Sequence, residues 1–135
     1  MPVPVDPVTS LFRPGSISKL FTWVSVMQLV EQGKLGLDDS LGHWVPELAS
    51  VQVLEGFDAA GAPRLRPPKR PITLRHLLTH TAGFGYFFIR PELLHYFAAV
   101  GTPDRSSLDS IRLPLLFDPG EAWEYSIATD WVGQA

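Results

Sequence analysis

The longest stretch of nearly continuous apolar positions lies within residues 16–33 and predicts the main helix of the chain. Residues 20–30 are apolar almost all round, and Gly33 follows as a residue typical of a helix C-terminus. A helix with apolar side chains on most of its faces belongs in the centre of a domain. We therefore expect this helix to be buried.

Shorter patterns downstream predict several small helices and little sheet. A strand-like piece at 9–13 precedes the main helix, and two short apolar runs flank a turn at 59–61 and predict an irregular hairpin. The further helices are expected at 41–45, 74–80, 91–100, 106–112 and from residue 128 onward. The pattern thus predicts a predominantly α chain.

Composition narrows the function classes. The 135 residues fit one domain, and a hydrophobic fraction of 45% is enough for a core. The net charge is −3 without a basic run, which argues against nucleic-acid binding. The absence of cysteine excludes thiol nucleophiles, disulfides and cysteine-based zinc sites.

The apolar run of about eleven residues is well short of the roughly 20 that span a bilayer, so no membrane span is expected. Residues 1–6 have neither a basic region nor an apolar core and do not resemble a signal peptide. A cytoplasmic location is expected if this N-terminus is complete.

A serine and a lysine stand three positions apart at the start of the main helix. Pro14 and Gly15 break the chain, and Ser16 and Lys19 then share one helix face. A neutral lysine could take the serine proton and generate a nucleophile without a histidine. The alternative is that Ser16 or Ser18 only caps the helix and that Lys19 is solvated.

Two further segments turn this weak pattern into a family resemblance. Residues 12–19 read FRPGSISK, residues 71–84 read PITLRHLLTHTAGF, and residues 118–126 read DPGEAWEYS. In order and spacing these segments resemble the Ser-x-x-Lys, TLRHLLTHTSG and PG-x-x-W-x-YS motifs of the β-lactamase-like serine hydrolases. This superfamily includes class C β-lactamases, D-alanyl-D-alanine peptidases and family VIII carboxylesterases. The sequence at 54–66 and at 125–130 is most similar to the esterases.

The resemblance implies an α/β (α+β) β-lactamase/transpeptidase-like fold, with a helical lobe beside an antiparallel sheet. Residues 1–135 would be a partial domain, mostly the helical lobe. The family's Lys/His/Trp-x-Gly motif and the main sheet have no counterpart before Ala135. The helix that begins at residue 128 meets the end of the chain, which also favours a fragment.

The resemblance also implies catalytic roles. Ser16 is expected to be the acylated nucleophile, Lys19 its general base and Tyr125 a second proton-transfer group. The backbone N–H of Ser16 would supply half of an oxyanion hole. Lysine and tyrosine are not bases at neutral pH, so burial and mutual coupling are expected to lower one pKa. Tyr125 could instead be a core aromatic beside Trp123. No metal or organic cofactor is implied.

The expected activity is that of a serine hydrolase, most specifically a carboxylesterase acting on small esters. Class C β-lactamases and the peptidases carry asparagine two positions after the tyrosine, where this chain has Ile127, which cannot hydrogen-bond a substrate amide. The alternatives are β-lactamase or peptidase activity on an amide, or a non-catalytic chain that is either a truncated fragment or an interaction module. A Ser-His-Asp esterase is disfavoured because no Gly-x-Ser-x-Gly occurs.

Two histidines and an aromatic cluster leave other options open. His76 and His80 have the i, i+4 spacing of a zinc pair, but no glutamate follows His76. We interpret His80 as a structural histidine whose ring bonds to nearby backbone. The aromatic residues are expected to line an acyl pocket or, equally, to pack in a core: Phe84, Tyr86, Phe87 and Phe88.

Overall fold

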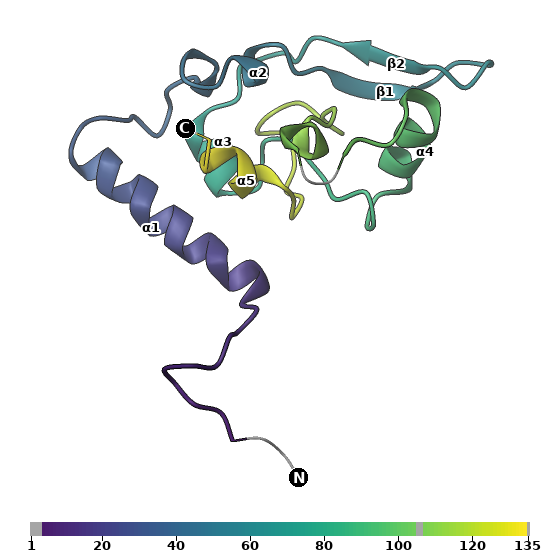
Figure 1. The fold of residues 1–135 in the computed structure, drawn as a ribbon. Coiled ribbons are helices and arrows are strands. Elements are labelled where there is room, and N and C mark those ends of the chain that lie inside the picture. Colours follow the sequence, from purple (N-terminus) through teal and green to yellow (C-terminus); the bar gives the residue numbers. More distant parts are fainter. Residues whose placement is uncertain (1–3, 105–106, 135) are drawn as a thin grey trace.

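A computed structural model describes residues 4–104 and 107–134 and shows a mostly helical chain with a small two-stranded sheet (Figure 1). This confirms the prediction of a predominantly α chain with little sheet. The elements in order, with η for 3₁₀ helices, are η1 Gly15–Ile17, α1 Ser18–Glu31, η2 Leu41–His43, α2 Pro46–Ala49, β1 Val53–Phe57, β2 Pro63–Arg66, α3 Leu74–Leu78, α4 Pro91–Val100, η3 Leu108–Ile111 and α5 Ala128–Val132.

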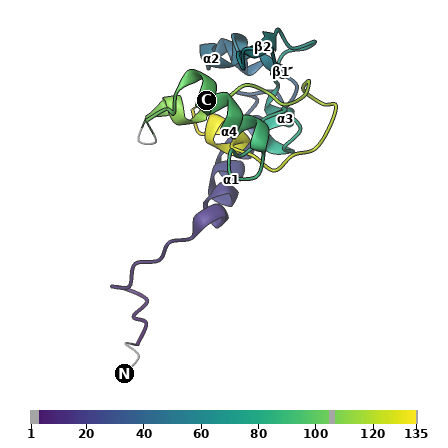
Figure 2. The ribbon, with the colours of Figure 1, turned by 90° about the vertical axis from the view of Figure 1, so that its right-hand side faces the viewer.

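The sequence pattern located most of these elements. The main helix divides into η1 and α1, and the hairpin, α4 and α5 lie where they were expected. For the helix expected at 106–112, residue 106 lies outside the described residues and η3 occupies 108–111. The strand expected at 9–13 does not form. This segment leads away from the rest of the chain, so it has no neighbouring strand among the described residues to pair with (Figures 1 and 2).

Two short helical segments have bounds that differ from the expected ones, because a proline begins one helix and a residue with positive φ follows the end of the other. The helix expected at 41–45 is reduced to η2, and the unpredicted α2 begins at Pro46, whose ring suits a first helical turn. α3 ends at Leu78, and His80 beyond it takes a positive φ of 56°.

The hairpin provides one wall of the core. β1 and β2 pair antiparallel with an irregular register between Leu54 and Gly56, where Gly56 has a φ of 133°. The segment before the third motif lies along β1. The N–H of Leu54 donates to the carbonyl of Leu115, and the N–H of Leu115 donates to that of Gln52, both at 2.8 Å. The hairpin thereby fixes the entry to residues 118–126.

The core lies between the hairpin, α3, α4 and α5. Phe84 is fully buried and stacks on Trp131 of α5, with ring centroids 6.1 Å apart. Burial of each large apolar side chain contributes about 1.5–3 kcal/mol. The other fully buried side chains include Leu41, Ile72, Leu74, Leu77, Leu93 and Leu115.

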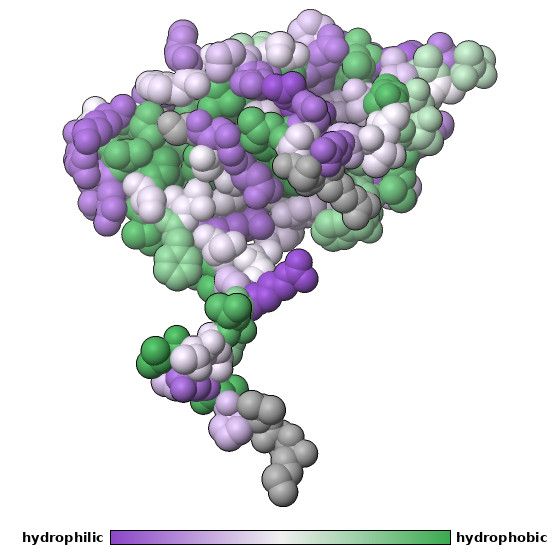
Figure 3. All heavy atoms as spheres, in the orientation of Figure 1, coloured by the Kyte–Doolittle hydropathy of each residue, from purple (hydrophilic) through white to green (hydrophobic). Residues whose placement is uncertain are grey.

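α1 is not buried in the centre, contrary to the sequence expectation. Only Val26 of this helix is buried, whereas Phe21 is 71% exposed. Figure 3 shows hydrophobic residues at the surface where Figure 1 places α1. One side of α1 packs on α5, and no described residue covers the other, where Leu20 and Val24 are also exposed. The apolar sequence of α1 therefore indicates a larger buried surface than the described residues provide.

Backbone hydrogen bonds join the second motif to the third. The N–H of Leu116 donates to the carbonyl of Gly83 (2.7 Å), and the N–H of Gly120 donates to that of Thr81 (2.8 Å). Gly83 has a φ of 100°, and a Cβ there would overlap the carbonyl oxygen of Phe117. The two segments can lie this close because residue 83 has no side chain.

No helix within 4–104 and 107–134 has the length and apolar character needed to cross a bilayer.

Candidate active site

Ser16 and Lys19 meet at the tip of the main helix. Gly15, with a φ of 56°, turns the chain into η1 and places Ser16 in the first turn. The Lys19 Nζ lies 3.4 Å from the Ser16 Oγ and donates to it. The Ser16 N–H, in the first turn, is among the groups that helix geometry leaves without an intrahelical acceptor. The Ser16 side chain is exposed, whereas the sequence predicted a buried helix.

Tyr125 lies beside the lysine, although 106 positions separate the two in sequence. The Lys19 Nζ is 5.4 Å from the centroid of the Tyr125 ring and 5.9 Å from that of Tyr86. The rings of Tyr86 and Tyr125 are 5.7 Å apart. The structure thus brings the three residues expected to be catalytic, Ser16 included, into one site. Their roles in catalysis stay predictions.

Lys19 is held in its charged form, so it is not the group of the pair whose pKa is lowered. Burial of the amine lowers its pKa, but its polar contacts with the phenols of Tyr86 and Tyr125, that of Tyr86 first, outweigh burial and raise it. At neutral pH Lys19 is therefore an ammonium ion and a hydrogen-bond donor. It becomes a base toward Ser16 only as the pH rises or when a bound molecule displaces a phenol.

Tyr86 is a site residue that the sequence reasoning did not identify as such. Burial raises the pKa of its phenol, and this effect outweighs the opposing effect of Lys19. The phenol therefore stays protonated beside the lysine. The sequence placed Tyr86 in an aromatic cluster but carried no signal that separated it from its neighbours.

The four aromatic residues that were expected to line an acyl pocket or to pack in a core do not all have the same surroundings. Phe84 belongs to the core and Tyr86 to the site, while Phe87 is half-buried against the core. Phe88 is 66% exposed and stacks on Tyr86 with ring centroids 4.8 Å apart.

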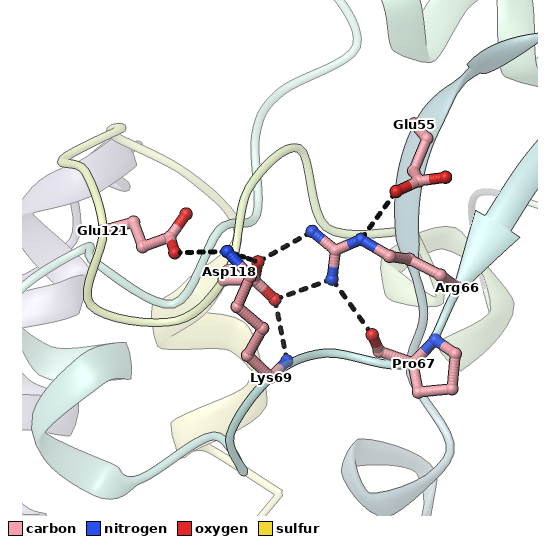
Figure 4. A network of polar contacts seen from close by, with 6 residues as sticks. All are labelled: Glu55, Arg66, Pro67, Lys69, Asp118 and Glu121. Carbon is pink, nitrogen blue, oxygen red and sulfur yellow. Dashed lines mark hydrogen bonds and ion pairs between the residues drawn. The ribbon is translucent and has the colours of Figure 1, made fainter.

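A buried carboxylate fixes the turn that precedes Tyr125 (Figure 4). Asp118 is fully buried and accepts two hydrogen bonds from the Arg66 guanidinium, at 2.9 and 2.7 Å. It also accepts the backbone N–H of Lys69 at 2.8 Å, and the Lys69 ammonium lies 3.2 Å away. These contacts, with that of Arg66 first, hold the pKa of Asp118 far below its usual range. The carboxylate therefore ties the third motif to β2.

α5 closes the other side of the site. Ile127 is 6% exposed and belongs to the core, so the position where class C relatives have asparagine contributes no polar group here. The indole Nε1 of Trp23 donates to the Thr129 hydroxyl at 3.1 Å, which joins α1 to α5.

Both histidines of the second motif accept backbone hydrogen bonds. The Nδ1 of His76 accepts the N–H of Thr73 at 3.2 Å in a capping box at the start of α3. The Nδ1 of His80 accepts the N–H of Ser126 at 3.3 Å, which confirms the structural interpretation of His80. Within the described residues, no three His, Cys, Asp or Glu side chains gather in a way that could hold a metal ion.

Two hollows share Ser110, and Lys19 lines the first of them. One of about 570 Å³ is bounded by polar groups that include Lys19, Thr129 and Asp130. Another of about 290 Å³ is lined mainly by apolar side chains of α4 and its surroundings, such as Phe87 and Phe97.

Comparison with known proteins relates this geometry to characterised enzymes. The acyltransferase mokF of Monascus pilosus is 42% identical over 125 residues, which are 90% of this chain and 30% of that protein. A lovastatin esterase of Penicillium rubens is 40% identical over 124 residues, 89% of this chain and 31% of that protein.

The fold agrees with a solved structure. The unliganded simvastatin synthase LovD of Aspergillus terreus superposes with a TM-score of 0.80 at 40% identity, over 88% of this chain and 30% of that one. The chain thus spans about a third of the length of these relatives. A family profile described as Beta-lactamase matches residues 2–135. With the helix-tip serine and lysine, the adjacent tyrosine and this match over nearly its whole length, the chain belongs to the Beta-lactamase family.

Proposed function

We propose that this chain carries the nucleophile and proton-transfer groups of a serine hydrolase that forms an acyl-enzyme on small-molecule esters. The observation that supports it best is the 3.4 Å contact between the Lys19 Nζ and the Ser16 Oγ, with two tyrosine rings around the amine. Relatives described as an esterase and as acyltransferases use acyl esters or acyl transfer, which fits the same first step.

In the proposed reaction, the Ser16 Oγ attacks the ester carbonyl carbon while its proton passes to the deprotonated amine of Lys19. The Ser16 N–H donates to the resulting oxyanion. The carbon–oxygen bond to the alcohol then breaks, and the alcohol oxygen takes a proton from the Tyr125 phenol or the Lys19 ammonium. Water attacks the acyl-enzyme to release the acid, and an alcohol at this step would instead give a new ester.

The two hollows suggest the class of ester. The polar hollow beside Lys19 suits the reacting group and its alcohol, and the apolar hollow near Phe87 suits a hydrocarbon portion. A buried Ile127 offers no hydrogen bond to an amide. We therefore favour esters with one apolar arm over β-lactams and peptides.

Labelling with an alkyl fluorophosphonate tests this proposal on the 135-residue chain. Mass spectrometry of the intact chain and of its peptides should find one adduct, on Ser16. Ser16→Ala should abolish the adduct. Ser18→Ala is the matched control, because Ser18 is an exposed hydroxyl two positions away that donates to the Gly15 carbonyl at 2.7 Å. It should keep the adduct.

Two other results would contradict the proposal. Turnover of nitrocefin without turnover of p-nitrophenyl esters would favour the β-lactamase alternative. A chain that folds by far-UV circular dichroism, yet remains unlabelled at Ser16 and elutes as an assembly, would favour the non-catalytic interaction module.

A further inference from the structure

We propose that His80 is a positioning residue that holds Tyr125 against Lys19 through the acceptor Nδ1 of its neutral ring. This inference rests on the proposed function for its catalytic meaning, but its geometry is independent of it. His80 touches neither Ser16 nor the expected reacting atoms and acts through the tyrosine.

His80 holds the chain on both sides of Tyr125. Its carbonyl accepts the N–H of Glu124 at 2.9 Å, and its ring Nδ1 accepts the N–H of Ser126 at 3.3 Å. Its ring also packs against the Tyr125 ring, with centroids 4.8 Å apart. His80 thus contacts the backbone of the residue before Tyr125, the backbone of the residue after it, and the Tyr125 ring itself.

The hydrogen bonds fix the protonation state of the ring. Both the Ser126 N–H, at 3.3 Å, and the Ser126 Oγ, at 3.4 Å, face Nδ1. A backbone N–H always donates, so Nδ1 carries a lone pair in the tautomer that accepts it. The proton of the neutral ring therefore sits on Nε2, which is buried and has no hydrogen-bond partner within the described residues. A second proton would bind at Nδ1, where it would break the hydrogen bond from the Ser126 N–H and leave only the Ser126 Oγ as an acceptor.

The surroundings of the ring favour this neutral form. His80 is 5% exposed, and the uncharged rings of Trp23 and Trp123 meet its ring edge-on at centroid distances of 6.0 and 6.4 Å. Among titratable groups, α1 contributes Lys19 and the third motif contributes Tyr125. Burial, and next the positive charge of Lys19, lower the pKa of His80.

The backbone conformation supports a dedicated role. His80 has a φ of 56°, in the left-handed region that few non-glycine residues adopt, asparagine, aspartate and histidine more often than the others. This conformation directs both the carbonyl and the ring of one residue toward 124–126.

Two substitutions separate positioning from space filling. His80→Asn places an amide oxygen close to the site of Nδ1 and tolerates the left-handed backbone, although it is smaller than histidine. His80→Gln is closer in volume but carries its amide beyond that site. If His80 only fills space, Gln should be the better replacement. If it positions Tyr125, Asn should be better, with fluorophosphonate labelling of Ser16 lowered about 10²-fold in Gln and far less in Asn.

The pH dependence provides a readout that packing alone would not move. The labelling rate of the unmodified chain, divided by that of His80→Asn at the same pH, cancels the ionisation of Lys19. This ratio should be constant near neutrality and fall in acid as the His80 ring takes its second proton. A ratio that stays constant down to the acid unfolding of the chain would overturn the proposal.

Nuclear magnetic resonance tests the contacts of His80 with Ser126 and Tyr125 even if Ser16 is not labelled. In the ¹⁵N-labelled chain, Nδ1 of His80 should resonate as an unprotonated nitrogen at neutral pH. Its titration should shift the Ser126 amide and the Tyr125 ring signals together. A protonated Nδ1, or a Ser126 amide that ignores the ring titration, overturns the positioning role. Correct coupling with an unlabelled Ser16 would instead overturn only the proposed function.

Discussion

The indole of Trp23 donates a hydrogen bond to the hydroxyl of Thr129 across a distance of 3.1 Å, and Thr129 is buried. Trp23 lies one turn beyond Lys19 on α1, and Thr129 lies in the first turn of α5, four residues after Tyr125. This contact sets the spacing between the helix that supplies the nucleophile and the segment that supplies the phenol.

Thr129→Val should therefore weaken the site as well as the fold. Valine keeps the shape but leaves the indole N–H without its acceptor, which costs about 1–3 kcal/mol. Urea unfolding should show this loss, and fluorophosphonate labelling of Ser16 should slow. Thr79→Val is the control, at an exposed threonine whose hydroxyl contacts only the Arg75 carbonyl and the Thr81 hydroxyl among the described residues. Equal effects of both substitutions would contradict the assigned role of the contact.

Tyr86→Phe should shift the alkaline rise in Ser16 labelling to lower pH. The Tyr86 phenol is the first of the contacts that raise the pKa of Lys19, while burial opposes them. Removing the phenol leaves the burial effect and lowers this pKa, so the neutral amine forms earlier as the pH rises. Tyr96→Phe, at a tyrosine of α4, should leave the midpoint unchanged. An unchanged midpoint in Tyr86→Phe would show that the phenol does not act on Lys19.

Asp118→Asn should be among the most destabilising single substitutions. It leaves the Arg66 guanidinium without its buried carboxylate, so we expect thermal unfolding about 10 °C or more lower. Asp109→Asn, which changes an exposed carboxylate paired with Arg112, should have little effect. A similar small effect at both positions would contradict the importance of the buried network.

The same carboxylate predicts a pH dependence of stability. The pKa of Asp118 in the folded chain lies far below its ordinary value, so the folded state keeps the ionised form when the unfolded state takes up a proton. Its contribution is complete above the ordinary aspartate range and declines as the pH falls below it. Urea unfolding between neutral and strongly acidic pH should show this decline, which Asp118→Asn should largely lack.

Gly83→Ala should destabilise the chain more than Gly61→Ala. Both glycines have positive φ, which costs an alanine about 1–2 kcal/mol. A Cβ at Gly61 meets open space, whereas one at Gly83 overlaps the Phe117 carbonyl oxygen and must displace the segment that leads to Tyr125. Only Gly83→Ala should also slow the labelling of Ser16. Equal destabilisation would contradict the close approach.

Local patterns predicted what depends on neighbours in sequence. The Ser16–Lys19 spacing fixes a shared helix face, and the motif that contains Tyr125 could be assigned a place beside them by resemblance. The structural role of His80 followed from the lack of a glutamate after His76. These conclusions needed no knowledge of how the distant segments pack.

Properties that depend on packing could not be derived in this way. The raised pKa of Lys19 results from two phenols that oppose burial, and their balance depends on distances the sequence does not contain. Tyr86 entered the site because the loop after Gly83 turns it toward α1, while Phe84 turns into the core. The exposure of α1 was missed because an apolar sequence indicates that a face will be covered but not by which residues.

The weak anchoring of α1 has a consequence for local opening. With only Val26 buried, this helix can detach from α5 at a much smaller cost than unfolding of the hairpin and the Phe84–Trp131 core would require. Amide hydrogens of α1 should exchange with solvent well before those of α3 and β1. Each such opening separates the Ser16 hydroxyl from Tyr125, so a molecule that seals the apolar side of α1 should slow exchange there and raise the fraction of time for which the three groups are assembled.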